Sequence, residues 1–162
     1  MVAREINDFG EEPLRENTPS ELDDLTHAEM CMLYKESADS IRFAKAHQWK
    51  SLGATLLVFG GLIALAQLAP NNATLINLII AISFLCSCAV IYMLALYQTW
   101  QNTEREKLRD IAGHFSSFSQ FTRAIKSSRE ANVHRYTLLL FMIVAIVLGN
   151  LLLVLIVSPL YR

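Results

Sequence analysis

Three long runs without a charged residue dominate the chain, at residues 51–69, 74–97 and 137–157. Each is close to the roughly 20 residues that a helix needs to cross about 30 Å of hydrocarbon. Soluble cores seldom contain runs of this length without one charge. The pattern therefore predicts an all-α integral membrane protein with three transmembrane helices, at residues 51–69, 74–97 and 136–158.

A turn signal separates the first two runs. Pro70 cannot continue a helix, and the following Asn71 and Asn72 favour a tight turn. Asn72 or Thr74 can then cap the next helix. The first two spans are expected to form an antiparallel hairpin.

The segment before the first span divides into a tail and a helix. Residues 1–24 hold eight Asp or Glu and only two Arg, so residues 1–18 are expected to be an acidic flexible tail, either a solvated leader or a docking strand for a basic partner. The sequence Thr18-Pro19-Ser20-Glu21 has the residues of a capping box. It predicts an amphipathic helix over residues 19–50, which either runs straight into the first span or bends near residues 50–53.

The second span meets no breaker before about Ser127. Residues 98–134 are therefore expected to form a helical connector that ends, from Ser127 to Val133, in a turn or a short returning helix. Its apolar positions alternate at spacings of three and four, which is typical of a helical-bundle seam. The seam consists of Leu108, Ile111, Phe115, Phe118, Thr122 and Ile125. Its expected mate is the apolar stripe of the N-terminal helix, Met30, Leu33, Tyr34, Ala38, Ile41, Ala44 and Gln48.

The positive charges indicate an orientation. Of the 14 Lys and Arg residues, eleven lie in residues 35–50 before the first span or in residues 105–135 between the second and third, and the hairpin turn at residues 67–77 has none. Loops rich in Lys and Arg stay in the cytoplasm. We therefore expect a cytoplasmic N-terminus, a cytoplasmic connector and a C-terminus outside, in a multi-pass protein of a bacterial inner membrane.

The spans hold no ionisable group of the kind that pumps and proton carriers keep within the hydrocarbon. Small and polar residues in them are instead predicted to lie at helix–helix or oligomer interfaces. These candidate interface residues are Asn150, Gly149, Ser83, Ser87, Gly60 and Gly61, with Gly53 as a further small residue. Three readings of Asn150 stay open: packing against Ser83 or Ser87 within the chain, contact between copies, or the lining of a pore.

The sequence offers few residues for a metal site or for catalysis. His27 and Cys31 share a helical face, but two ligands are too few for structural zinc. Cys86 and Cys88 point to opposite faces of a helix and are read as small packing residues. Phosphate-binding loops and nucleophile motifs do not occur in the sequence. We expect no enzyme activity, no cofactor, no metal and no nucleic-acid partner.

The layout resembles one family. A polar helix with Tyr34-Lys35-Glu36-Ser37, a tight transmembrane hairpin, and a cytoplasmic helix with Glu104, His114-Phe115 and Phe118 are similar to the bacterial SLATT family of small hairpin membrane proteins. The similarity covers about residues 33–125. It implies a membrane-perturbing effector that acts beside nucleotide-signalling defence systems. The third span and the outside C-terminus depart from that pattern, and no functional residue carries over.

Two functions follow from these features. The first is a non-catalytic accessory or scaffolding subunit that lies in the lipid bilayer and assembles with itself or with other subunits of a membrane complex. The alternative is an oligomeric channel or pore-forming effector, with copies of the second span lining a path. Since a pore needs a polar stripe along a whole span, and here Ser83 and Ser87 are mixed with Phe84, Leu85 and Ile91, the first reading is preferred.

Overall fold

Three long helices form the described part of the chain. The structure is a computed structural model, and it describes residues 18–68, 70, 72–117 and 128–161. The helices are α1 (Asp24–Leu68), α2 (Ala73–Gly113) and α4 (Ser128–Val157), followed by the 3₁₀ turn η1 (Ser158–Tyr161). Each long helix contains a stretch long and apolar enough to cross a membrane. Within the described residues the fold is all-helical, which confirms the all-α part of the prediction.

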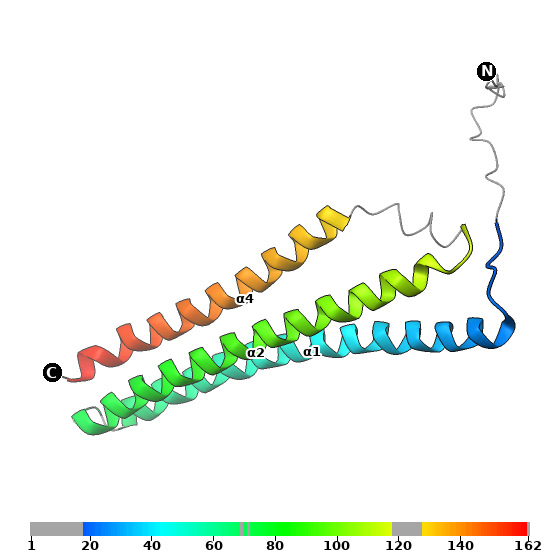
Figure 1. Ribbon diagram of the computed structural model, residues 1–162. Helices are drawn as coiled ribbons and strands as arrows, with labels where there is room; N and C mark the ends of the chain where they lie inside the picture. The colour runs from blue at the N-terminus through cyan, green and yellow to red at the C-terminus, as the bar shows by residue number, and fades with distance from the viewer. Residues whose placement is uncertain (1–17, 69, 71, 118–127, 162) are drawn as a thin grey trace, which may run out of the picture.

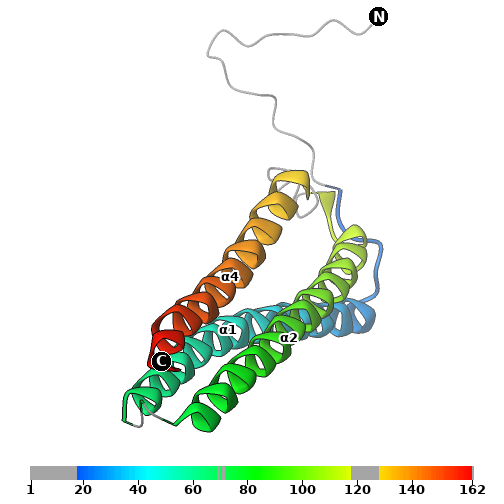
Figure 2. The same cartoon turned by 90° about the vertical axis from the view of Figure 1, so that its left-hand side faces the viewer.

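The helices form an antiparallel arrangement that has two different ends. α1 and α2 lie side by side as a hairpin, and α4 runs along their flank (Figures 1 and 2). We call the end with Pro70 and η1 the hairpin end, and the end where α1 begins and α2 finishes the open end. At the open end α1 and α2 continue past the first turn of α4 (Figure 1). At 45 and 41 residues, they are about 68 and 62 Å long, twice the thickness of a hydrocarbon core.

The apolar core lies between all three helices, towards the hairpin end. Together with the buried polar residues between them, the buried apolar side chains recur mostly at intervals of three, four or seven positions, so each helix contributes one narrow stripe. They are Leu52, Phe59 and Ala66 of α1, Ile76, Ile79 and Leu94 of α2, and Met142, Ile146, Leu153 and Val157 of α4. Large apolar side chains also cover the outer faces of these segments, including Leu57 at 78% exposure and Leu85 at 72%. Such outward apolar surface is what a helix presents to lipid.

The first helix resolves one open alternative and corrects one prediction. α1 passes without a break from its polar half into its apolar half, so the N-terminal helix is continuous with the first predicted span. Its start, however, is Asp24 rather than Pro19. The Thr26 backbone N–H donates to the Asp23 carboxylate at 3.3 Å, so Asp23 acts as the cap. The predicted cap Thr18 and the nearby Ser20 instead bond across to residues at the end of α2.

The second helix is shorter than predicted. Asn72 caps its start by accepting from the Leu75 N–H at 3.1 Å, which confirms one of the two expected caps. Its last residue is Gly113, not a residue near Ser127. His114 closes the helix and its carbonyl accepts the Ser20 hydroxyl at 3.0 Å. The His114 backbone N–H donates to the Ile111 carbonyl oxygen at 3.1 Å, which tightens the last turn of the helix.

The third helix is longer than predicted. α4 begins at Ser128 and continues into the apolar run without interruption, so the segment from Ser128 to Val133 is neither a turn nor a separate short helix. Neither Gly nor Pro occurs between Ser128 and Gly149 to break it. As predicted, the helix ends before Ser158-Pro159, where η1 takes over.

Candidate functional site

A polar contact joins α4 to α2 in the middle of the apolar segments. The Asn150 Nδ2 donates to Ser87 Oγ at 2.8 Å, and the Ser87 hydroxyl donates to the Ser83 carbonyl oxygen at 2.8 Å. All three residues are buried, with Asn150 at 6% exposure. Three candidate interface residues therefore meet within one chain, which is the first of the three alternatives considered for Asn150.

Gly149 lies beside Asn150 and brings α4 against α1. A Cβ atom placed at Gly149 would lie 3.0 Å from Leu56 Cδ2 and 3.1 Å from Phe59 Cδ2. Only a hydrogen at this position leaves the α1–α4 contact undisturbed. Gly60 and Gly61 behave differently: both are exposed, and a Cβ at either would meet nothing within 4 Å. The expectation that they permit close packing is therefore wrong for the contacts within this chain.

A pair of buried glutamines joins α1 to α2 at the boundary between the apolar and polar halves. Gln48 Nε2 donates to the Leu94 carbonyl oxygen at 3.1 Å, and Gln101 Nε2 donates to Gln48 Oε1 at 2.9 Å. Sequence reasoning placed Gln48 in the apolar stripe and did not single out Gln101. The available signal was an uncharged polar residue in a position where the stripe is otherwise apolar.

A second polar group links α2 to α4 at the same level. Asn102 is its centre, since Arg135 Nη1 and Gln98 Nε2 both donate to its Oδ1, at 3.2 and 3.4 Å. The Asn102 amide donates in turn to the Tyr136 hydroxyl at 3.3 Å. Aromatic side chains are frequent here, and Tyr97 stacks between His47 and Trp100 at centroid distances of 6.0 and 6.4 Å. Belts of Tyr and Trp of this kind are typical of membrane–water boundaries.

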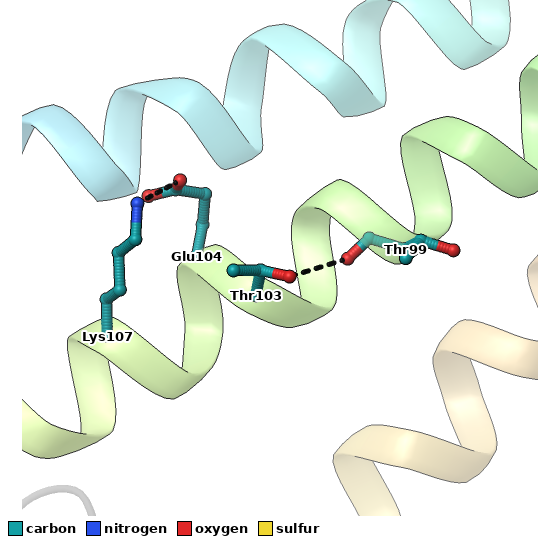
Figure 3. A network of polar contacts seen from close by, with 4 residues as sticks. All are labelled: Thr99, Thr103, Glu104 and Lys107. Atoms are coloured by element: carbon teal, nitrogen blue, oxygen red, sulfur yellow. Dashed lines mark hydrogen bonds and ion pairs between the residues drawn. The ribbon is translucent and has the colours of Figure 1, made fainter.

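Beyond this level α1 and α2 continue as a two-helix stalk, residues 24–50 of α1 and 98–113 of α2. A groove of about 410 Å³ follows their contact, and it is lined by Leu33, Glu36, Ser37, Ser40, Glu104, Lys107, Asp110 and Ile111. Glu104 is nearly buried and accepts from Lys107 Nζ at 2.8 Å (Figure 3). Hydrogen bonding to Lys107, together with the Ser37 hydroxyl, outweighs burial and lowers the pKa of Glu104.

The stalk is closed at the open end by the segment before α1. Thr18 exchanges two hydrogen bonds with Ser117, at 2.9 and 3.1 Å. Phe115 follows the end of α2 and packs against His27 and Tyr34 of α1, with ring centroids 5.5 and 6.1 Å apart. The sequence thus correctly pairs the N-terminal stripe with the seam.

The structure describes some residues of the predicted seam and not others. Leu108 and Ile111 are half-buried on α2 as the seam requires, and Phe115 contacts α1 from beyond the helix end. Phe118, Thr122 and Ile125 lie outside the described residues. The stalk positions that the sequence missed are polar or small, namely Gln98, Gln101, Glu104 and Ala112, all buried.

Cysteine and histidine side chains do not assemble a metal site in the described part of the chain. Cys31 Sγ lies 3.7 Å from His27 Nε2 at the surface, and no group of three or more His, Cys, Asp or Glu surrounds a common point among the described residues. Cys86 is half-buried and Cys88 is exposed, in keeping with opposite faces of α2.

Comparison with known proteins gives no relative. No protein-family model matches the chain, and neither the curated proteins nor the solved structures contain a significant match.

Proposed function

We propose that this chain is a non-catalytic accessory subunit of a membrane complex, anchored in a bacterial inner membrane by its three apolar helices with its N-terminus in the cytoplasm. In this role the stalk holds a partner subunit at a fixed distance from the bilayer. The positive-inside distribution of Lys and Arg supports a cytoplasmic stalk.

One observation carries the proposal: the stalk exposes a line of large apolar side chains outside the apolar segments. Leu25 is 71% exposed, Met32 70% and Phe43 53%. At 3.6 residues per turn these three positions lie within about 20° of one another around α1. Leu25 and Met32 face away from the stripe that packs on α2, whereas Phe43 also contacts Trp100 of α2, with ring centroids 6.2 Å apart. Apolar side chains aligned on a solvated helix are typical of a surface that a partner covers.

Charges on the same face define the partner's chemistry. Glu29, Glu36 and Asp39 are exposed on or beside the apolar line; Glu36 also borders the groove against α2, and Asp39 pairs with Arg42 of its own helix at 3.2 Å. A second copy of the chain would set these carboxylates against one another, whereas a helix with apolar and basic residues complements both features. We therefore assign the face to a basic amphipathic helix of another subunit.

The inward position of the polar groups within the apolar segments supports the function of a membrane anchor rather than that of a pore. Ser83, Ser87 and Asn150 bond to one another inside the three-helix packing, away from the outer surface along which copies would meet. A path between copies would be lined by apolar side chains such as Leu85 and Leu57.

The test is native mass spectrometry of the full chain, extracted at native expression level in a mild detergent. The wild-type chain should appear in a complex of defined stoichiometry with another subunit, and Met32→Ser should lose it. Leu68→Ser, which replaces an 83%-exposed apolar residue of α1 at the hairpin end, is the matched control and should retain it. A chain that is monomeric, or one that forms only homo-oligomers that conduct ions in planar bilayers, would overturn the proposal.

A further inference from the structure

A small cleft opens between the three helices, next to the glutamine pair. Each helix contributes one basic side chain to it: Lys45 from α1, Arg105 from α2 and Arg135 from α4. The remaining lining residues are neutral, namely Gln48, Gln98, Gln101, Leu138, Leu139 and Met142. Among the described residues the cleft thus has three cationic groups and no carboxylate on its walls.

Arg105 is poorly satisfied within the chain. Its Nε atom is buried and has no hydrogen-bond partner among the described residues. Burial and, secondarily, the positive charge of Arg135 lower the pKa of Arg105. Lys107, two positions along α2, shows the contrast, since it is paired with Glu104 at 2.8 Å. Two neighbouring guanidinium groups with a buried unbonded N–H form an incomplete site, and an anion completes it.

The position of the cleft defines the kind of anion. α4 contributes Arg135 and the apolar residues Leu138, Leu139 and Met142, whereas α1 and α2 contribute the glutamines, Lys45 and Arg105. Tyr136, next to Arg135, is 52% exposed, and Trp100 is 41% exposed near the same level of α2. Aromatic residues beside an apolar and a cationic wall match the boundary between acyl chains and headgroups.

We propose that this cleft binds the phosphate of an anionic phospholipid headgroup, with Arg105 and Arg135 as the principal ligands and Lys45 at the edge. The interior volume of about 20 Å³ has room for a single water-sized atom, so one phosphate oxygen enters and the rest of the headgroup lies across the opening. The acyl chains follow the apolar wall of α4. This site is independent of the partner-binding face, which lies on the outward side of α1.

Binding can be measured with the full chain in a neutral detergent and a short-chain phosphatidylglycerol as the probe. Arg105→Gln and Arg135→Gln should each weaken binding about fivefold, the loss expected for one basic group near an anionic surface. Arg109→Gln removes an exposed charge from the same helix, outside the cleft, and should leave the affinity unchanged. Short-chain phosphatidylcholine should bind at least tenfold more weakly, and inorganic phosphate alone tests whether the headgroup needs its lipid.

A further variant keeps the proposal testable if the arginine variants misfold. Lys45 is exposed, so Lys45→Gln should fold normally and still weaken binding, with Lys35→Gln as the control on the same helix. Equal binding of phosphatidylglycerol and phosphatidylcholine, or equal affinity of the wild type and the cleft variants, would overturn the proposal. Phosphate that binds as tightly as the lipid, and loses affinity in the same variants, would keep the anion site but overturn the lipid as its source.

Discussion

The hydrogen bond between Asn150 and Ser87 yields a quantitative prediction. Its 2.8 Å length and the burial of both residues make it the clearest polar link between α4 and α2 within the apolar segments. Interhelical hydrogen bonds in membranes contribute about 0.6 kcal/mol on average and about 1.7 at most. The Ser87 hydroxyl also donates to the Ser83 carbonyl, so loss of Asn150 leaves no orphaned donor and the coupling should lie near the lower value.

A double-mutant cycle isolates this contact. Asn150→Ala, Ser87→Ala and the double variant are unfolded with SDS in mixed micelles, and helicity is followed by circular dichroism. The destabilisations caused by the two single variants should add up to about 0.6 kcal/mol more than the destabilisation caused by the double variant. This coupling corresponds to about a threefold factor in the unfolding equilibrium constant. The destabilisation that each variant causes through lost side-chain volume cancels in the cycle. Thr103 is a matched control, because its hydroxyl bonds only to the Thr99 carbonyl on its own helix (Figure 3).

The cycle also distinguishes a contact within the chain from one between copies. Asn150→Ala should shift the unfolding midpoint and leave the oligomeric mass unchanged. A coupling of zero between positions 150 and 87, or one equal to the coupling between 150 and 103, would contradict the assigned hydrogen bond. A change of oligomeric mass without a change of midpoint would contradict the intramolecular assignment.

Three further predictions use the same unfolding assay. Gly149→Val should cost about 1–3 kcal/mol, because its side chain would overlap α1, whereas Gly60→Val has free space and should cost far less. Gln48→Leu should cost about 1–3 kcal/mol by leaving Gln101 without its acceptor; a result near zero would contradict the glutamine pair. The pKa of Glu104 is lowered in the folded chain, so its stabilisation is present above the unfolded-state pKa and is lost as pH falls through the folded value. Glu104→Gln should therefore lower stability at neutral pH and reduce its loss on acidification; an unchanged pH profile would contradict this.

The sequence predicts the three apolar helical stretches and the turn between the first two helices well, because these features depend on local composition. Uncharged runs define the apolar stretches, Pro70 stops the first helix, and Asn72 caps the second; none of these needs knowledge of a partner helix. The pairing of the N-terminal stripe with the seam follows from helical periodicity as well. Asn150 was identifiable as a residue that needs a partner, and Ser87 was one of two named candidates.

The errors arise where tertiary contacts compete with local signals. Thr18 and Ser20 have the side chains of a helix start, but their hydrogen bonds go to Ser117 and His114, about 95 positions away. α2 ends at Gly113, where the Ser20 hydroxyl bonds to the His114 carbonyl, and this contact could not be read from the local sequence. The glutamine pair depends on the register between α1 and α2, which periodicity alone does not specify. Gly60 and Gly61 show that a small residue indicates a close contact only when its face is known.

The uninterrupted course of α1 and α2 from the apolar core into the stalk has a mechanical consequence. A continuous helix transmits a change of tilt along its length, so in the proposed membrane placement the pair would act as a lever that pivots at the headgroups. The part of α1 at residues 24–50 is about 40 Å long at 1.5 Å per residue. A tilt of about 10°, well within the range by which helices adapt to bilayer thickness, would displace the far end by about 7 Å. A change in membrane thickness would thus change the position of the face formed by Leu25 and Met32.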